Sequence, residues 1–201
     1  MTTAATMLGQ MPVAKLTLNE LSRRVGLAKS NVLRYFESRE AVLLELLDQE
    51  FADWCQDVRE KLQVDATLSA HERANKVARQ LAASLAERPT LCDLISAQAS
   101  VLEHNVSVDV VRQHKQNIAV AVDVIGAAIA DALPELTRES IYEVVVITIL
   151  SSAAAWPSAR VPEAVQAVYD SDPSIAATHI EYADYLSRTV GLVIVGLLAR
   201  P

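Results

Sequence analysis

Cysteine, glycine, proline and aromatic residues are all scarce in this sequence of 201 residues, which has two Cys, five Gly and seven Pro. Cys55 and Cys92 form neither a CxxC pair nor a Cys/His cluster, so no disulfide framework or zinc site is expected. The two isolated thiols suit a reducing cytoplasm. Few helix-breaking residues, together with abundant Ala, Leu and Val, favour helices over a β-sandwich.

Long apolar runs are also lacking. Met1–Gln10 has neither a basic start nor a long apolar stretch, so no signal peptide is expected. The most apolar run near the C-terminus, Thr189–Ala199, has about half of the ~20 residues that cross a bilayer, which predicts no membrane span. No segment alternates between apolar and polar residues with a period of two, so no strand is expected and the predicted fold is all-α.

Positive charge is scarce overall but is concentrated near the N-terminus. The formal net charge is −7, which as an average argues against a nucleic-acid partner. Residues 1–36, however, carry five basic residues and one acidic residue, whereas the remaining 165 carry 13 basic and 24 acidic residues. A small basic head on an acidic body predicts a protein that contacts phosphate groups at one end only.

Helical periodicity runs through most of the chain, with capping residues where helices are expected to begin. Thr17–Glu20 and Ser69–Glu72 have the pattern of a capping box. Ser38, Ser107 and Thr137 are further expected N-caps. The expected helices cover residues 18–25, 28–35, 39–62, 70–87, 89–104, 108–133, 138–156 and 174–198, with one or two short turns at 163–169.

Residues 16–47 have the pattern of two short helices joined by a tight turn and followed by a long helix. The first helix ends at Gly26, which tolerates the conformation of helix ends. In the second helix, Val32 and Phe36 would face inward. That leaves polar side chains on its outer, N-terminal part: Lys29, Ser30, Asn31 and Arg34. This arrangement is typical of a DNA recognition helix, whose N-terminal side chains enter the major groove, where Asn can pair with adenine and Lys with guanine.

Residues around the second short helix suit phosphate contacts. Tyr35 offers a hydroxyl group. Arg39 lies in the first turn after the expected cap Ser38, where free backbone N–H groups also attract an anion. Nearby basic residues add attraction that does not depend on DNA sequence.

These features make the sequence similar to the TetR (tetracycline-repressor-like) family of transcriptional regulators over about 32 residues. The matching positions are Thr17, Ser22, Gly26-Leu27-Ala28, the run Asn31–Phe36, and Ser38-Arg39-Glu40. By this resemblance, base contacts fall on Asn19, Lys29, Ser30 and Asn31, and phosphate contacts fall on Thr17, Tyr35 and Arg39. The resemblance also implies a small-molecule effector of unknown identity inside the body, and a four-helix dimer interface formed by the last two long helices of each subunit.

Two positions and the start of the chain depart from the family pattern. Ala28 stands where the family has a capping residue, which costs the recognition helix about 1 kcal/mol. Leu33 stands where the family has Tyr, so one DNA contact is missing. The family's first helix begins further upstream, whereas in this sequence only residues 2–11 are left for that helix. Together these departures predict weaker DNA binding than the family norm.

Candidates for an effector pocket and a dimer interface lie in the body. An apolar pocket with a few polar groups is expected to involve Cys92, Gln98, His104, Tyr142 and Trp156, although each of these alone also suits ordinary core or surface. Two helical stretches near the C-terminus are apolar almost all round, which predicts that they pack against a second copy. The expected interface residues are Ile149, Ala153, Tyr182, Val190 and Ile194. The histidines are too far apart on their helices to form a metal pair, so no metal is expected.

The sequence therefore predicts a cytoplasmic, all-α homodimer with a helix-turn-helix DNA-binding domain at 1–47 and an effector-binding and dimerisation domain at 48–201. Its predicted partners are a palindromic double-stranded DNA operator, a small-molecule effector and a second copy, with no cofactor and no membrane. The predicted function is a regulator released from its operator by the effector. Repression is the family default, and the residues do not separate it from activation.

Two other functions compete with this one. An enzyme or carrier is disfavoured, because the sequence has no nucleophile–base pair, phosphate-binding loop or HExxH motif. The remaining alternative is a degenerate family member that has lost operator binding and acts as a small-molecule-binding or interaction protein.

Overall fold

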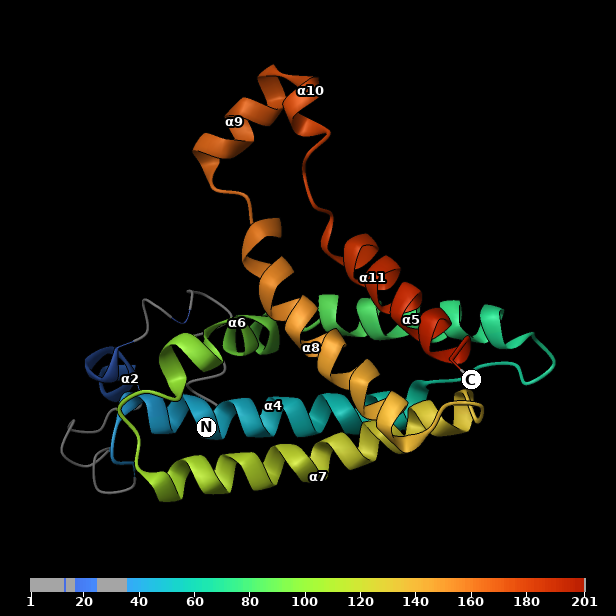
Figure 1. Ribbon diagram of the computed structural model, residues 1–201. Helices are drawn as coiled ribbons and strands as arrows, with labels where there is room; N and C mark the ends of the chain where they lie inside the picture. Colours follow the sequence, from blue (N-terminus) through green and yellow to red (C-terminus); the bar gives the residue numbers. More distant parts are fainter. Residues whose placement is uncertain (1–12, 14–16, 25–35, 201) are drawn as a thin grey trace. The chain divides into compact units, whose positions relative to one another are not determined.

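The computed structural model describes residue 13, residues 17–24 and residues 36–200 of the chain. No strand occurs among these described residues, and the all-α prediction is confirmed. The helices, labelled in Figure 1 where there is room, are α2 (Leu18–Arg24), α4 (Arg39–Lys61), α5 (Ala70–Ala86), α6 (Pro89–Ala97), η2 (Gln98–Leu102), α7 (Val108–Ala132), α8 (Arg138–Ala159), α9 (Glu163–Ser171), α10 (Pro173–Ala176) and α11 (Tyr182–Leu198).

The predicted N-caps are confirmed. Ser38 Oγ accepts the backbone N–H of Ala41 at 3.1 Å and so begins α4. Ser69 and Glu72 form the full reciprocal capping box at the start of α5. The hydroxyls of Thr137 and Ser107 accept backbone N–H groups three residues further along, at 3.2 and 3.3 Å. Each cap satisfies an N–H group that the first turn of a helix leaves without a partner.

The helix expected at 89–104 is instead two elements. α6 passes into η2, a π-helix in which the Glu103 N–H donates to the Gln98 carbonyl at 3.1 Å, five residues back. Asn105 then takes a left-handed conformation with φ 58°, which Asn tolerates better than most residues, and the chain turns toward α7. π-helices of this length are rare and often mark functional sites.

The helix expected at 174–198 is interrupted, and the one expected to end at 156 is longer. Asp172 caps the short α10 through the backbone N–H of Ser174 at 2.9 Å. Glu181 then takes an extended conformation and caps α11 through the N–H of Asp184 at 2.6 Å, so the final helix starts afresh. α8 continues past Pro157, because a proline in the last turn removes only one hydrogen bond.

The chain divides into two compact units. The first comprises Met1–Lys61 and Arg88–Ile125, and the second comprises Leu62–Glu87 and Gly126–Pro201. The predicted domain boundary at residue 47 lies inside α4, which continues unbroken to Lys61, so it does not coincide with this division. As a functional boundary it stays a prediction.

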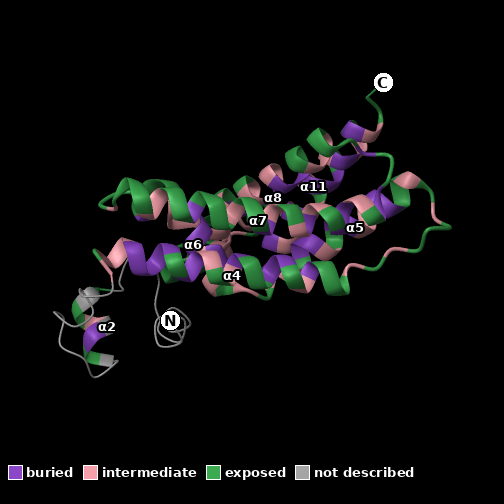
Figure 2. Ribbon diagram, turned by 90° about the horizontal axis from the view of Figure 1, so that it is seen from below, coloured by how far each residue is buried: buried purple, intermediate pink, exposed green. Residues whose placement is uncertain are grey.

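In the first unit, α4 packs against α6 and η2. The buried side of α4, purple in Figure 2, carries apolar side chains such as Leu43, Leu47 and Trp54 that have no exposed surface. Leu91 and Leu94 of α6 are equally buried. This core fixes the N-terminal half of α4, where the polar residues described below lie.

In the second unit, α11 packs mainly against α5 and also against α8. Gly191 permits the close approach of α11 to α5, because a Cβ placed there would lie 3.4 Å from Asn75 Oδ1 and 3.6 Å from Ala78 Cβ. Ser152 of α8 and Tyr182 of α11 share a buried hydrogen bond of 2.7 Å. α9 and α10 project away from this packing, contain no buried residue, and contact each other (Figure 1).

α8 is long and apolar enough, by length and composition, to cross a membrane, although core helices of soluble proteins meet the same test. Only 33% of its most apolar stretch is buried within the chain. The polar residues Thr148 and Ser152 are among the buried ones, and both are hydrogen-bonded. α8 therefore contributes one side to the core and leaves an apolar side exposed.

Candidate functional site

Three of the eight predicted DNA-contacting residues lie among the described residues. Thr17 Oγ1 accepts the backbone N–H of Glu20 at 3.1 Å, as expected of a helix cap, and Asn19 is exposed in the first turn of α2. The Arg39 guanidinium donates to Glu40 Oε1 at 2.9 Å and to the carbonyl of Val13. A phosphate at Arg39 would compete with these partners. Lys29, Ser30, Asn31, Arg34 and Tyr35 lie outside the described residues, and their DNA contacts stay predictions.

An open pocket of about 580 Å³ lies between the N-terminal half of α4 and that of α7. Its volume is within the range of pockets that hold small molecules. We call it the α4/α7 pocket; its lining is Phe36, Glu37, Ala41, Leu44, Glu45, Asp48, Val110, Gln113, His114 and Asn117. The lining includes both apolar and polar side chains, so the pocket can hold an apolar group and a charged or hydrogen-bonding group together.

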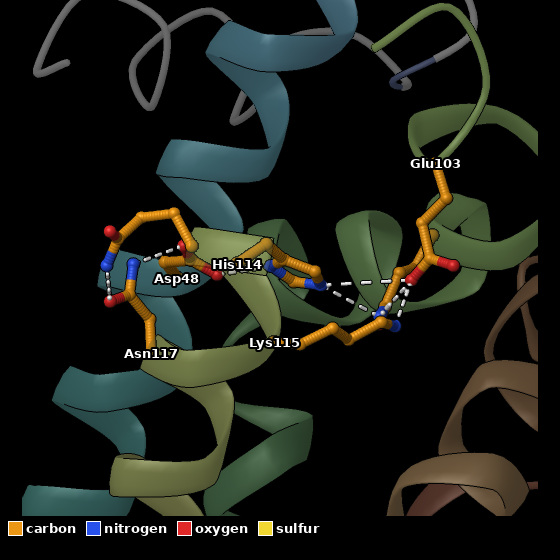
Figure 3. Close-up of polar contacts among 7 residues, drawn as sticks. Asp48, Glu103, His114, Lys115 and Asn117 are labelled. Atoms are coloured by element: carbon orange, nitrogen blue, oxygen red, sulfur yellow. Dashed lines mark hydrogen bonds and ion pairs between the residues drawn. The ribbon is translucent and has the colours of Figure 1, made fainter. Parts of the chain in front are cut away.

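A chain of polar side chains begins at the wall of this pocket and continues behind it (Figure 3). Asp48 of α4 accepts from Asn117 Nδ2 at 2.7 Å through one carboxylate oxygen and contacts His114 Nδ1 through the other. His114 Nε2 lies 3.0 Å from the Gln98 amide nitrogen, which is also 2.9 Å from Glu103 Oε1. These polar side chains therefore connect α4, α7 and η2 through consecutive contacts.

His114 is the buried centre of this chain, with 1% of its surface exposed. Its Nδ1 contacts the Asp48 carboxylate, and its Nε2 faces the Gln98 amide nitrogen. Both ring nitrogens then have partners, as a buried polar group requires. Loss of the contact with Asp48 or of the contact with Gln98 would leave a buried nitrogen of His114 without that hydrogen bond. The connected polar side chains therefore hold each other in place.

Glu103, directly after η2, is the last of these connected polar side chains. Burial opposes ionisation of its carboxyl group, but hydrogen bonds from Lys115 and Gln98 outweigh it and hold the pKa of Glu103 below its usual range. The Lys115 ammonium also forms an ion pair with it. Glu103 is therefore ionised at neutral pH, and the Gln98 amide between it and His114 has a fixed orientation.

None of the five residues predicted for an effector pocket lines the α4/α7 pocket. Cys92 is fully buried in the core, Gln98 lies behind His114, and His104 is exposed. Tyr142 and Trp156 belong to the second unit, where Tyr142 is exposed and Trp156 stacks edge-on against Tyr182. A pocket role for these five residues stays a prediction.

The lining residues carried a signal in the sequence. Positions 41, 44, 45 and 48 follow the i, i+3, i+4, i+7 spacing of one helix face, and positions 110, 113, 114 and 117 follow the same spacing. Nothing in the sequence indicates that these two faces, more than 60 residues apart, meet each other. The pairing of Asp48 with His114 is a tertiary contact that periodicity does not predict.

The predicted dimer-interface residues divide into two groups. Tyr182, Val190 and Ile194 are buried within the chain itself, and Ile149 and Ala153 are half-buried. The apolar side chains that the same two helices leave most exposed are different ones: Tyr142, Leu150 and Leu192. The five predicted interface residues stay a prediction, because burial within the chain does not show where a second copy would bind.

Two family profiles match the chain. The one described as "Bacterial regulatory proteins, tetR family" matches residues 1–46. The one described as "Tetracyclin repressor-like, C-terminal domain" matches residues 48–201. No curated protein matches the sequence.

Solved structures share the fold at low sequence identity. A TetR transcriptional regulator from Rhodococcus sp. RHA1 is 12% identical, with a TM-score of 0.59 over 99% of this chain and 93% of its own. The fatty acid degradation regulator FadR from Bacillus halodurans is 11% identical, with a TM-score of 0.59 over 100% of this chain and 94% of its own. At these identities the likeness extends to the fold alone.

Proposed function

This chain belongs to the tetR family of bacterial regulatory proteins, and from that premise we propose that it is a ligand-responsive repressor, released from a palindromic operator by a small molecule. The observation that carries the proposal is the family match over residues 1–46, where the basic helix-turn-helix pattern lies. Family members are regulators and not enzymes, and we extend this to the present chain. We place its action in the cytoplasm, where an operator would be found.

We propose that the functional unit is a homodimer formed through α8 and α11. Leu150 and Leu192 are 61% and 75% exposed, and α8 leaves most of its apolar stretch uncovered within the chain. A Cβ placed at Gly196 of α11 would meet nothing within 4 Å, so a partner helix could approach closely there. Apolar surface of this kind on a helix pair supports burial against a second copy.

The α4/α7 pocket supports an effector site in the same unit as the start of α4. Residues 36 and 37 line the pocket and directly follow the predicted recognition helix, and Ser38 begins α4. A ligand that favours one position of α4 over another would change the affinity for DNA, because coupling requires only unequal binding to the two states. In a dimer, the two recognition helices must match a groove repeat of about 34–36 Å, so a small change is sufficient.

Fluorescence anisotropy with labelled DNA from the region upstream of the gene would test this function. We expect saturable binding of a dimer that weakens steeply as salt is added. Lys29→Ala and Asn31→Ala should each weaken specific binding by about 5- to 100-fold. Arg79→Ala removes an exposed positive charge from α5, outside the helix-turn-helix segment, and serves as the control.

Two results would contradict the proposal. Equal, weak binding to every DNA at low salt would favour an interaction protein that has lost operator binding, the alternative that Leu33 suggests. Specific binding that survives both substitutions in the recognition helix would place the DNA contacts elsewhere.

A further inference from the structure

The charge of the α4/α7 pocket points to the chemical class of its ligand. Its lining includes three carboxylates, from Glu37, Glu45 and Asp48, and none of the described lining residues is Lys or Arg. We infer that the effector is an organic cation, with an ammonium or related group beside an apolar body. This inference rests on the proposed role of the pocket as the effector site.

The three carboxylates differ in how far they are already engaged. Asp48 is bonded through both oxygens, to His114 and Asn117, and Glu37 accepts the backbone N–H of Ser107. Glu45 is exposed at the edge of the pocket, and no hydrogen bond or ion pair joins it to another described residue. Glu45 is therefore the carboxylate that can pair directly with a ligand, while Asp48 adds a fixed negative charge one helical turn away.

The remaining lining suits an organic body more than a bare metal ion. Phe36, Leu44 and Val110 offer apolar contact, and an aromatic ring also attracts a cation to its face. Among the described residues, no group of three His, Cys, Asp or Glu side chains is arranged to hold a metal ion. A volume of about 580 Å³ accommodates a drug-sized molecule. An anion of the same size would be repelled by all three carboxylates.

Three probes that share one apolar body and differ in their polar end test the inference: 4-phenylbutylamine, 4-phenylbutanol and 4-phenylbutyrate. Binding to the full chain is measured by isothermal titration calorimetry at low and high salt. We expect the amine to bind about tenfold more tightly than the alcohol, the carboxylate to bind most weakly, and the preference to shrink as salt is added. Equal affinities, a preference for the carboxylate, or no binding of the amine at millimolar concentration would overturn the inference.

Substitutions at Glu45 locate the interaction. Glu45→Gln should weaken binding of the amine about five- to tenfold and leave the alcohol unchanged, whereas Glu45→Lys should reverse the order of amine and carboxylate. Glu60→Gln, an exposed carboxylate on the same helix outside the pocket, is the matched control and should change neither. Because Glu45 is exposed, both variants should keep the fold, which circular dichroism checks. Unchanged amine affinity in Glu45→Gln would contradict the site.

The regulator function and the class of effector can be tested separately. If the amine binds and DNA does not, the pocket stands and the regulator function falls. If DNA binds specifically and the amine does not bind, only the class of effector is wrong. Where both bind, the amine should lower the affinity for DNA in the unsubstituted protein and have less effect on Glu45→Gln.

Discussion

Arg73 is a buried cation that joins three parts of the second unit. With 9% of its surface exposed, its guanidinium donates to the carbonyl of Leu68 at 3.3 Å and to that of Ala132 at 2.8 Å, and it pairs with Glu135. The Ala132 carbonyl is at the end of α7, where helix carbonyls have no partner within the helix. The Arg73 side chain thus connects the start of α5 to the end of α7.

Replacing Arg73 by Met should therefore lower the free energy of unfolding by about 2–3 kcal/mol, because two backbone carbonyls lose a charged donor. Urea denaturation followed by circular dichroism measures the change. Arg79→Met on the exposed side of the same helix is the control and should change stability by less than about 0.5 kcal/mol. Equal effects of the two substitutions would show that the buried contacts contribute nothing.

The pH dependence of this contact has a defined sign. The hydrogen bond from Arg73 holds the pKa of Glu135 below its usual range. The stabilisation is therefore fully present above the ordinary Glu pKa of about 4.3 and is lost as the pH falls through the lowered value. The carboxylate is largely exposed, so solvent screening keeps this part of the effect small.

Cys55 should be chemically inert in the folded protein. Burial raises the pKa of its thiol to about 12, so almost no reactive thiolate exists at pH 8. Cys92 is also fully buried. We expect a colourless thiol reagent such as Ellman's reagent to release its coloured product only after guanidinium chloride unfolds the chain, with both cysteines then reacting. Fast reaction of either thiol in the native protein would contradict the burial described for α4 and α6.

At the scale of the element, the capping residues are the part of the fold that the sequence predicted best. A cap depends on side-chain chemistry three residues away, so Ser38, Ser69, Ser107 and Thr137 were recognisable without tertiary information. The break before α11 was not recognised, although Asp172 and Glu181 cap the two helices locally. η2 was not recognised because it depends on how the flanking helices pack. The same reason explains why the α4/α7 pocket was missed.

Removal of the capping box should measurably weaken α5. Ser69→Ala is expected to cost about 1 kcal/mol, because it leaves the Glu72 N–H without its acceptor. Ser69→Asp keeps an acceptor at that position and should restore most of the stability. Urea denaturation of the three proteins compares them directly, and a loss in Ser69→Asp as large as in Ser69→Ala would show that the hydroxyl acts in some other way.

At the scale of the whole molecule, self-association through α8 and α11 is the prediction with the clearest readout. Leu192→Glu places a charge on an exposed position of α11 that a partner would bury, so the dimer should weaken by more than about tenfold. Size-exclusion chromatography with light scattering across a concentration series measures the molecular mass.

Two further variants make that experiment specific. Val120→Glu introduces the same charge at an exposed residue of α7 in the first unit and should leave the dimer intact. A Cβ placed at Gly196 would meet nothing within 4 Å in its own chain, so a loss of dimer in Gly196→Val is expected to come from a clash with the partner helix. A dimer that withstands both Leu192→Glu and Gly196→Val would assemble through some other surface.

η2 has a consequence at the level of the gene. A π-helix holds one more residue in its turn than an α-helix would, and each residue of an α-helix turns the chain by about 100°. Deleting a single codon within 99–102 would allow that turn to close as an ordinary helix, while the core residues before it kept their places. Gln98 and Glu103 would then face new directions relative to each other and to His114. A deletion of one codon keeps the reading frame. In a single mutational step, a descendant protein could therefore keep its helices and lose the side-chain contacts that connect residues 98–103 to α4 through His114.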